Sequence, residues 1–466
     1  MDTGLKPFQS SQEVFSWLGS FTNLEAGQIP KSFNPKRMDA LMEAAGNPQR
    51  RVPSIHVAGS KGKGSLTGMI TAILEAAGFR VLQFVSPHVR DFRERITQGF
   101  NYLDERVYIA AGEELRRFMG SLPAALGGAR RLFDQNEPEG CAPTYFELLT
   151  LYFFLCAGQT PCDLLAVETG MGGLQDPTNV VDPLAAVITV IELEHTEFLG
   201  PSVASVAEKK AGIIKQGKPL FLAPQQEAAL EVFRKTAQEK NAPLYYFPEI
   251  AGLRNLRVHK EGSDFTLVCK TPGFFPEPLD LSIAIPGAAQ AQNAGLAALA
   301  VRRCFPAIGK ETIQRGLAGF TLPARFERLW PLRKSGPPLI IDGAHTERSV
   351  ELTAATFYAL YGGGGVLIFG CAEGKNAAAM AALLEPRFSR IFITAPGTFK
   401  ASNPREIYRI FAGQLERSPN KAALALVLDP GEALRQALAA AAADCLPILG
   451  TGSFYLAAEL RRAAGA

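Results

Sequence analysis

The sequence predicts an α/β protein built on a doubly wound, mostly parallel sheet, with a small antiparallel β part and a second, smaller α/β domain. An apolar run at 54–58 leads through a glycine-rich turn into a helix pattern, which begins a strand–helix–strand unit. Two more apolar runs, at 164–167 and 185–191, have the length of buried parallel strands. From 322 onward, strand and helix patterns alternate again without a hairpin.

The bulk composition indicates a small-molecule partner. The 466 residues are too many for one hydrophobic core and predict two or three domains. With 48 basic and 45 acidic residues the net charge is +3, which favours neither nucleic acid nor a membrane as partner. Seven scattered cysteines without C-x-x-C spacing indicate neither disulfides nor a thiolate metal site. Since no signal-peptide pattern or membrane-length apolar run occurs, we expect a cytoplasmic protein, and we take a monomer as the default expectation.

Helix patterns dominate the chain on either side of the first strand, around 12–18, 35–45, 104–126 and 144–158. The last of these patterns is apolar on almost every side, as is typical of a buried helix, and its one acid is Glu147. Carboxylates are rarely buried without a partner, so a capping or ion-paired role for this acid is favoured, and a role in a functional site stays open.

The turn after the first strand has the chemistry of a phosphate-binding loop of the P-loop type. Gly59, Gly62 and Gly64 permit positive φ and leave backbone N–H groups open to a phosphate. The next helix points its N-terminus at this turn, Lys63 can neutralise phosphate oxygens, and the Ser65 hydroxyl can bind Mg²⁺. The spacing is a variant, because Gly64 separates Lys63 from Ser65. A merely tight connection is the simpler alternative, but strand, lysine, hydroxyl and helix together favour the phosphate loop.

Polar residues follow the two later strands, at Glu168 and His195. Ligands of open α/β sheets bind outside the carboxyl ends of the strands, where residues 59–65, Ser86, Glu168 and His195 would meet. A carboxylate, an imidazole and two hydroxyls, completed by water, suit a hard cation. Taken singly, such residues are often structural; the site is favoured because four of the five histidines lie in or beside such stretches.

Residues 202–247 alternate between helix and strand patterns. The first of these helices carries Lys209, Lys210 and Lys215 in the run AEKKAGIIKQG. Lysines on a helix usually keep their ammonium groups in water, so a solvated face is the simplest interpretation of all three.

The remainder of the chain separates into a hairpin region and a second domain. Residues 256–285 predict an antiparallel hairpin with its turn at 261–264 and one further strand, and 288–304 predict a helix. The five strand–helix alternations that follow predict a Rossmann-like α/β domain. We therefore expect domains at 1–321 and 322–466.

A series of motifs resembles the folylpolyglutamate synthase and dihydrofolate synthase branch of the Mur ligase superfamily. They are HVAGSKGKGS (56–65), SPH followed by ERI (86–96), ETGMGGLQDPTNVVDP (168–183) with EHTEFLG (194–200), KAGIIKQG (210–217), PGAAQAQNA (286–294), LPARFE (322–327), DGAH (342–345) and TGSFYL (451–456). No single motif is decisive, but their order over nearly the full length argues against an accidental likeness.

The resemblance implies an ATP-dependent ligase of folate metabolism. In the family, the γ-phosphate of ATP is transferred to a folate carboxylate, and the amine of L-glutamate attacks the acyl phosphate, so that ADP and phosphate are released. The first domain would bind ATP and the second would bind glutamate. The acceptor stays open between dihydropteroate, the γ-carboxyl of a reduced folate, and both, and so does the length of the polyglutamate product.

The resemblance also implies roles for single residues. ATP contacts are implied for Gly59, Ser60, Lys61, Gly62, Lys63, Gly64, Ser65, Asn293, Arg325 and Asp342. Two Mg²⁺ ions would be held by Ser65, Ser86, Glu168, His195 and Lys210, the last as a carbamate. Because a carbamate turns the cation into an anion, this role replaces the solvated-face interpretation for Lys210. The substrate residues are His345 and Ser453, and the catalytic residues are Lys63, Lys210 and His345.

Departures from the family pattern lie mostly in the second domain. They are Leu174, Glu194, Ala289, Thr346 with Glu347, Gly374 with Lys375 and Asn376, and Phe399 with Lys400 and Ala401. They leave the expected ATP and metal residues in place, and they leave open how the glutamate site is built.

Two alternatives to a folate ligase stay open. A ligase of the cell-wall branch would need a further N-terminal domain for a UDP sugar, whereas only about 55 residues precede the phosphate loop. A nucleotide-binding homologue without ligase activity, acting as a sensor or scaffold, is weakly favoured by Thr346, Gly374 and Asn376. The presence of Lys63 and Lys210 argues against it.

Overall fold

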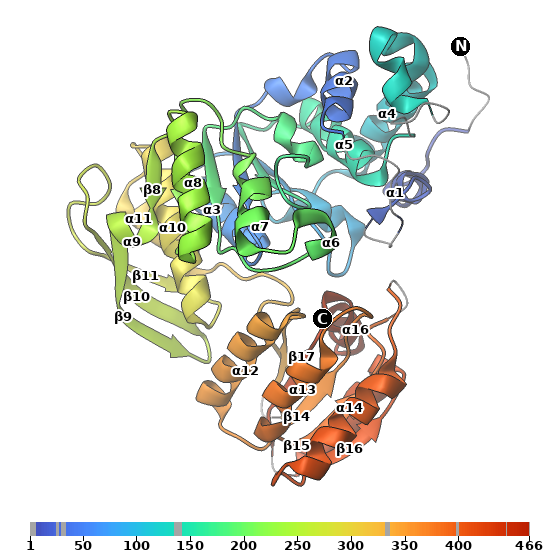
Figure 1. Cartoon of the computed structure of the whole chain (residues 1–466), viewed down its shortest axis with the longest axis vertical. Helices are drawn as coiled ribbons and strands as arrows, with labels where there is room; N and C mark the ends of the chain where they lie inside the picture. The colour runs from blue at the N-terminus through green and yellow to red at the C-terminus, as the bar shows by residue number, and fades with distance from the viewer. Residues whose placement is uncertain are drawn as a thin grey trace. The chain divides into compact units, whose positions relative to one another are not determined.

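In the computed structural model the chain divides into two compact units (Figure 1). The first comprises Met1–Leu256, Asp264–Ser282 and Ala289–Phe320, and the second comprises Arg257–Ser263, Ile283–Ala288 and Thr321–Ala466. The structure describes residues 6–24, 28, 34–134, 142–330, 336–397, 400–443 and 445–465. The departure expected at Phe399 lies outside these described residues.

An eight-stranded sheet forms the centre of the first unit. Its strands are β1 Ser54–Ala58, β2 Val81–Phe84, β3 Ile96–Gln98, β4 Asn101–Tyr102, β5 Leu164–Glu168, β6 Ala185–Ile188, β7 Leu220–Leu222 and β8 Leu244–Tyr246. The order β4-β3-β2-β5-β1-β6-β7-β8 is parallel from β2 to β8, whereas β3 runs antiparallel to β2 and β4 antiparallel to β3. The predicted mostly parallel sheet is confirmed. The short strands β3 and β4 are not predicted, because two or three residues are too few to show an alternating pattern.

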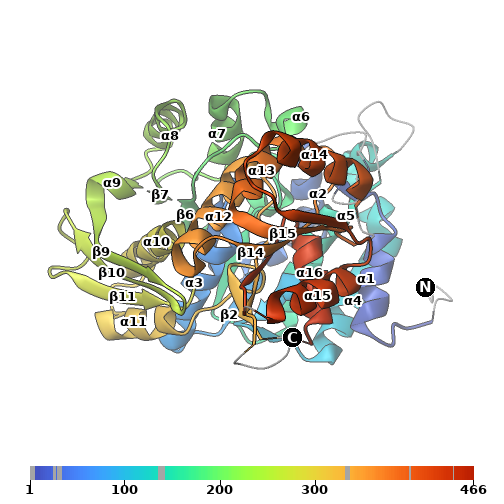
Figure 2. The same cartoon turned by 90° about the horizontal axis from the view of Figure 1, so that it is seen from below.

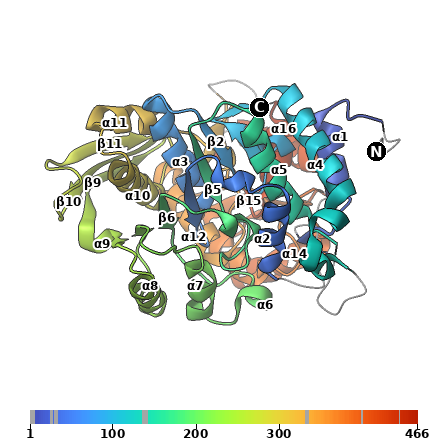
Figure 3. The same ribbon diagram turned by 90° about the horizontal axis from the view of Figure 1, so that it is seen from above.

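Helices accompany this sheet, and two apolar clusters join most of them to it. The helices are α1 Ser11–Gly19, α2 Lys36–Ala44, α3 Lys63–Ala76, α4 Glu105–Ala125, α5 Tyr145–Gln159, α6 Thr196–Leu199, α7 Val203–Ala211 and α8 Glu227–Glu239. One cluster joins α1, α2, α4 and α5 to β2 and β5, and the other joins α7 and α8 to β6 and β7 (Figure 3). Every residue of β1, β5 and β6 is buried, which explains why these strands are mostly apolar.

A three-stranded sheet follows along the chain, in the order β11-β10-β9. Its strands are β9 Ala251–His259, β10 Gly262–Cys269 and β11 Leu279–Ile283, and the neighbouring helices are α9 Phe247–Ile250, α10 Ala288–Cys304 and α11 Lys310–Ala318. The turn expected at 261–264 is wrong, since β10 already begins at Gly262. A Cβ on Gly262 would lie 1.9 Å from the carbonyl oxygen of Ile283, so this glycine permits a close approach of two backbones and does not form the turn.

The second unit is built on a six-stranded sheet. Its strands are β12 Glu327–Leu329, β13 Leu339–Ile341, β14 Gly365–Phe369, β15 Phe388–Ile393, β16 Ala423–Leu426 and β17 Ile448–Thr451, and its helices are α12 Glu347–Tyr361, α13 Ala377–Leu384, α14 Pro404–Arg417, α15 Pro430–Ala442 and α16 Phe454–Ala463. The order is β12-β13-β17-β14-β15-β16, parallel except for the edge strand β12. Figure 2 shows α12, α13 and α14 on one face of the sheet and α15 and α16 on the other. The predicted doubly wound second domain is confirmed.

Glu147 has the structural role that its burial favours. It forms a capping box with Thr144 at the start of α5. The Nε atom of Arg37, itself buried, donates to Glu147 Oε1 at 3.0 Å, and Nη2 donates to Oε2 at 3.1 Å. The ion pair and the cap together use both carboxylate oxygens.

Two expectations from composition concern membranes and thiols. Across the described ranges, no helix is both long enough and apolar enough to span a bilayer. The cysteines in those ranges are free thiols, namely Cys156, Cys162, Cys269, Cys304, Cys371 and Cys445. Cys141 lies outside the described residues.

Candidate active site

The turn between β1 and α3 has the geometry of an anion-binding loop. Gly59 and Gly62 adopt φ values of 144° and 86°. A Cβ on Gly59 would lie 1.7 Å from Thr189 Oγ1, and one on Gly62 would lie 2.7 Å from Asn293 Nδ2. Because α3 begins at Lys63, the first N–H groups of this helix open onto the turn. The glycines are therefore required both for backbone conformation and for close packing.

The segment after β6 holds this loop in place. The Ser60 backbone N–H donates to the carbonyl oxygen of Val190 at 3.0 Å, and the Ser60 hydroxyl donates to that of Glu192 at 3.0 Å. Lys63 Nζ donates to the carbonyl oxygen of Gly59, also at 3.0 Å. This bond draws the Lys63 ammonium back over the turn, so a cation and the exposed N–H groups face the same space.

A buried charge cluster lies beside the loop. Lys210, at the end of α7, is completely buried, and its Nζ donates to Gly59 O at 2.9 Å and to Glu194 Oε1 at 2.8 Å. Lys61 Nζ lies 3.6 Å from the other oxygen of Glu194. The solvated-face interpretation is therefore wrong for Lys210, because packing of α7 against the loop takes this lysine out of water.

The cluster shifts the pKa values of both Lys210, which is buried, and Glu194, which is partly buried. Burial lowers the pKa of Lys210 to about 8, and the nearby ammonium of Lys63 acts in the same direction, against the attraction of Glu194. Burial alone would raise the pKa of Glu194, but the charges of Lys210, Lys63 and Lys61 outweigh it and lower that pKa to about 2. Glu194 is thus ionised at neutral pH, and Lys210 has a larger neutral fraction than an ordinary lysine.

Glu168 lies at the carboxyl end of β5, directly against the phosphate loop. Its Oε2 accepts the backbone N–H of Ser86 at 3.3 Å, and a Cβ on Gly64 would lie 3.4 Å from the same oxygen. The buried Ser65 hydroxyl finds no hydrogen-bond partner within the described part of the chain. A buried carboxylate next to an orphaned hydroxyl is the kind of oxygen set that fits Mg²⁺.

His195 is the exposed member of the expected metal set. It has a φ of 46° and caps the N-terminus of α6, one residue after Glu194. No three His, Cys, Asp or Glu side chains in the described ranges lie close enough together to hold a metal on their own. The expected set therefore depends on hydroxyls as well. The structure brings the phosphate loop, Ser86, Glu168, Lys210 and Asn293 to one end of the sheet, and it places His195 on the segment that supports the loop.

His56 belongs to the core and not to this site. The number of histidines counted in support of the site was therefore too high. It is buried within β1, and its Nε2 lies 2.8 Å from Thr178 Oγ1, whose hydroxyl donates to Asp176 Oδ1 at 2.5 Å. Since that hydroxyl is the donor to Asp176, it accepts from a protonated Nε2. Burial lowers the pKa of His56 to about 3, and this imidazole is therefore neutral at physiological pH.

In the second unit, Asp342 anchors the turn that follows β13. Its Oδ1 accepts the Ala344 N–H at 2.8 Å and the Thr353 hydroxyl at 3.1 Å, and its Oδ2 accepts the Phe326 N–H at 2.8 Å. Burial raises the pKa of Asp342, although the nearby charge of Arg325 opposes this shift. The carboxylate thereby fixes the loop that carries Arg325.

The other expected residues of the second unit surround the ring of Phe454. The Arg325 guanidinium lies 4.1 Å from the ring centroid, and the His345 ring centroid lies 5.7 Å from it. His345 Nδ1 lies 2.9 Å from the carbonyl oxygen of Gly343, which can only accept, so Nδ1 carries a proton. Ser453 is buried and caps α16 by accepting the Tyr455 N–H at 3.1 Å.

Two departures from the family pattern act as helix caps. The Thr346 N–H donates to Ser349 Oγ at 3.0 Å in a capping box at the start of α12. Asn376 accepts the Ala379 N–H at 3.2 Å at the start of α13 and donates to Glu347 Oε1 at 2.7 Å. Both substitutions therefore have a local structural explanation.

The residues that sequence reasoning missed are those that act through packing. Glu194 entered only as a departure, whereas the structure makes it the partner of Lys210. Thr189 fills the space against Gly59, and Gln225 contacts the segment after β6. An acid beside a strand-end histidine was a usable indication for Glu194, but no local pattern points to Gln225.

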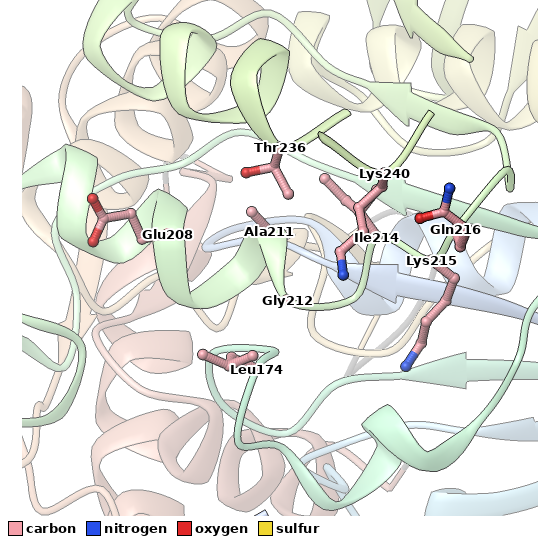
Figure 4. A pocket seen from close by; sticks show the side chains of 9 residues that line it. All are labelled: Leu174, Glu208, Ala211, Gly212, Ile214, Lys215, Gln216, Thr236 and Lys240. Atoms are coloured by element: carbon pink, nitrogen blue, oxygen red, sulfur yellow. The ribbon is translucent and has the colours of Figure 1, made fainter. Parts of the chain in front are cut away.

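A cavity of about 320 Å³ opens at the ends of α7 and α8 (Figure 4). It is lined by Leu174, Glu208, Ala211, Gly212, Ile214, Lys215, Gln216, Thr236 and Lys240, and it includes none of the expected site residues. Lys215 Nζ donates to the carbonyl oxygen of Asn179 at 2.7 Å, and burial lowers the pKa of this partly buried lysine. The solvated-face interpretation is therefore wrong for Lys215 as well.

Comparison with known proteins assigns the chain to a family. Residues 132–301 match the Mur ligase middle domain, and residues 324–454 match the Mur ligase, glutamate ligase domain. The dihydrofolate synthase/folylpolyglutamate synthase of Bacillus subtilis (strain 168) is 32% identical over 354 residues, which are 75% of this chain and 76% of that protein. The chain belongs to the folylpolyglutamate synthase and dihydrofolate synthase family of Mur ligases.

More distant members of the family extend the match over the full length. The folylpolyglutamate synthase of Lacticaseibacillus casei is 28% identical over 459 residues, or 97% of each chain. The solved structure of Mycobacterium tuberculosis folylpolyglutamate synthase complexed with ADP and AMPPCP has a TM-score of 0.83 and 26% identity, with 98% of each chain covered. The family predicted from the motifs is thus confirmed.

Proposed function

We propose that this chain is an ATP-dependent ligase that joins a folate carboxyl group to L-glutamate through an acyl phosphate, with release of ADP and phosphate. The observation that carries the proposal is the loop at 59–65, which holds the Lys63 ammonium over open N–H groups in a chain of this family. The relatives are named for folylpolyglutamate and dihydrofolate synthesis. A carboxylate is a poor electrophile, and its phosphorylation supplies a leaving group for the attacking amine.

Lys63 and the loop N–H groups bind the phosphates of ATP and stabilise the charge on the transferring group. Phosphoryl transfer depends on positioning and positive charge more than on covalent help. Asn293, which packs against Gly62, contributes from α10. Arg325 and Asp342 are the nucleotide contacts that we propose for the second unit; the bond from Phe326 to Asp342 supports this role, because it fixes the loop that carries Arg325.

Ser65, Ser86, Glu168 and His195 are the residues that would hold Mg²⁺, and Lys210 as a carbamate would hold a second ion. Bound Mg²⁺ neutralises charge on phosphate oxygens. The supporting observations are the orphaned Ser65 hydroxyl and the Glu168 carboxylate at the loop. These oxygens lie at the carboxyl end of the sheet, where ligands of α/β folds bind.

The carbamate of Lys210 is supported by its lowered pKa of about 8. A neutral amine nitrogen forms the bond to the carbon of CO₂ and releases one proton. Lys210→Ala should depress the ligase rate, and added short carboxylates should restore it in part. A wild-type rate in Lys210→Ala without any carboxylate would exclude this role.

His345 and Ser453 are the residues that we propose for glutamate binding. The protonated Nδ1 of His345 is committed to Gly343, which orients Nε2 away from the backbone. Ser453 is fixed by its cap on α16. Residues held by backbone contacts of this kind can orient a small amino acid without rearrangement.

An acceptor panel tests the function. Dihydropteroate and tetrahydrofolate are each incubated with ATP, Mg²⁺ and labelled glutamate, and ADP release and label incorporation are measured. We expect glutamate-dependent ADP release with at least one acceptor and none when glutamate is omitted. Nucleotide binding without any glutamate-dependent turnover would instead support the sensor or scaffold alternative.

We also propose that the protein is a cytoplasmic monomer. The small net charge argues against a membrane or nucleic-acid partner, and a monomer is the default expectation. Light scattering behind a sizing column should give the mass of one chain, and a dimer mass would contradict the proposal.

A further inference from the structure

Gln225 bridges two strand ends beside the phosphate loop, although it belongs to none of the motifs. It follows β7, and its Oε1 accepts the Ile191 N–H at 3.0 Å while its Nε2 donates to the Thr189 carbonyl oxygen at 2.8 Å. The backbone N–H of Gln225 lies 3.4 Å from the Tyr246 hydroxyl at the end of β8. Both side-chain bonds agree with one orientation of the amide, because Ile191 offers only a donor and Thr189 only an acceptor in these contacts.

The Gln225 side chain continues the hydrogen bonding between the two chain segments beyond the last paired residues of β6 and β7. The last registered pair of β6 and β7 is Ile188 with Leu222, and the Ala223 N–H still donates to Ile188 O at 2.9 Å. The next residue is Pro224, which has no N–H to donate. The side-chain amide therefore supplies the donor and the acceptor that the β7 backbone no longer offers to the chain after β6.

The segment held in this way carries the contacts of the phosphate loop. Its Val190 and Glu192 carbonyl oxygens accept the two hydrogen bonds of Ser60. Its Thr189 side chain occupies the space into which a Cβ on Gly59 would project. Thr189 and Ile191 are both fully buried. If the Gln225 side-chain amide were removed, water could not readily replace it at these two backbone groups.

We propose that Gln225 is a positioning residue of the ATP site. It fixes the position of the phosphate loop through the segment at 189–195. The same segment carries Glu194 and His195, so one amide aligns both the loop and these two residues next to it. The expected change in the KM for ATP rests on the proposed function. The expected change in amide hydrogen exchange does not, because it can be measured without turnover.

The test uses three variants. Gln225→Leu removes the donor and the acceptor at similar size. Gln225→Glu keeps an acceptor for Ile191 but sets a carboxylate oxygen against the Thr189 carbonyl. Gln226→Leu is the matched control, because this exposed neighbour caps α8 without a side-chain hydrogen bond.

For Gln225→Leu we expect the KM for ATP to rise roughly tenfold, while the KM for glutamate stays within about twofold of wild type, on the scale of one lost positioning contact. Amide hydrogen exchange in peptides that cover 59–65 and 189–195 should accelerate in this variant and in Gln225→Glu, but not in Gln226→Leu. If Gln225→Leu does not fold, Gln225→Glu carries the same two measurements.

The inference is overturned if exchange in both segments matches the control, or if the apparent kcat falls while both KM values stay unchanged, as they would for a smaller folded fraction. Absence of ligase turnover in the wild type would refute the proposed function alone. In that case a direct ATP titration, weakened in Gln225→Leu and unchanged in Gln226→Leu, still decides the role of Gln225.

Discussion

Two partly buried carboxylates, Glu194 in the first unit and Asp342 in the second, have pKa values that move in opposite directions. Burial would raise the pKa of Glu194, but Lys210, Lys63 and Lys61 lower it to about 2. Burial does raise the pKa of Asp342, which has the charge of Arg325 near it and otherwise accepts hydrogen bonds from neutral groups.

This difference shows that charged neighbours, and not burial alone, decide the direction of the pKa shift of a strand-end acid. In the first unit the fold concentrates ammonium groups where a polyphosphate would bind. In the second unit it builds a mostly neutral hydrogen-bonded frame around the turn after β13, which suits orientation more than charge neutralisation.

The most drastic way to disturb the charge cluster is Lys63→Ala. We expect ADP formation to fall by at least about 100-fold, because one preorganised charge at transferring phosphate oxygens is worth this much or more. Coupled ADP-release assays measure the effect, and circular dichroism checks the fold. Lys235→Ala, at an exposed position on α8, is the control. Unchanged turnover in Lys63→Ala would contradict the phosphate role.

Adding a Cβ to a glycine at a strand end should have different effects on substrate binding in the two units. In Gly59→Ala the new carbon meets Thr189 Oγ1 at 1.7 Å, so we expect ATP binding to be lost. In Gly452→Ala it meets Gly370 O at 2.6 Å within the second unit, so ATP binding should weaken less than in Gly59→Ala while use of glutamate declines. Calorimetric ATP titration and the KM for glutamate measure the two effects.

The control for both glycine substitutions is Gly78→Ala, where φ is 90° but no atom lies within 4 Å of the added carbon. It should cost only backbone strain, on the order of 1 kcal/mol, without loss of binding. Wild-type ATP affinity in Gly59→Ala would show that the loop is not confined by Thr189.

The opposite pKa shifts predict opposite pH dependence. The folded pKa of Glu194 lies below its ordinary 4.5, so its stabilising contribution is present above that pH and is lost as the pH falls toward 2. The folded pKa of Asp342 lies above 3.8, so its contribution is present below that pH and is lost as the pH rises through the folded pKa.

Urea unfolding of Glu194→Gln and Asp342→Asn against wild type measures these contributions. Glu194→Gln should cost more near about pH 6 than near about pH 3, by on the order of 2 kcal/mol. For Asp342→Asn the cost should be larger at the lower pH. The same pH trend in both variants would refute the comparison.

The smallest effect is expected for Phe454→Leu in the second unit. The ring lies under the Arg325 guanidinium and beside His345, and a Cβ on Gly343 would lie 2.2 Å from it. Losing this platform should raise the KM for ATP by roughly threefold to tenfold, the scale of the cation–π contact of Arg325, and it should also weaken glutamate binding through His345. Unaltered kinetics would show that Arg325 and His345 keep their places without the ring.

Much of the fold could be predicted because its evidence is local. Buried strands such as β1 and β5 are mostly apolar, and the phosphate loop is a contiguous set of glycines with Lys63 and Ser65. The turn expected at 261–264 failed for a non-local reason, since Gly262 serves an approach to Ile283 far along the chain.

The two wound sheets, the glycine-rich turn at 59–65 and the family could be predicted from the sequence, because short apolar periods, turn chemistry and motif order are properties of neighbouring residues. Only the tertiary structure decided that Lys210 is buried against Glu194 and that Gln225 bonds the segment after β6. Such contacts join residues from different strand ends, and which distant partners meet depends on how the whole sheet packs.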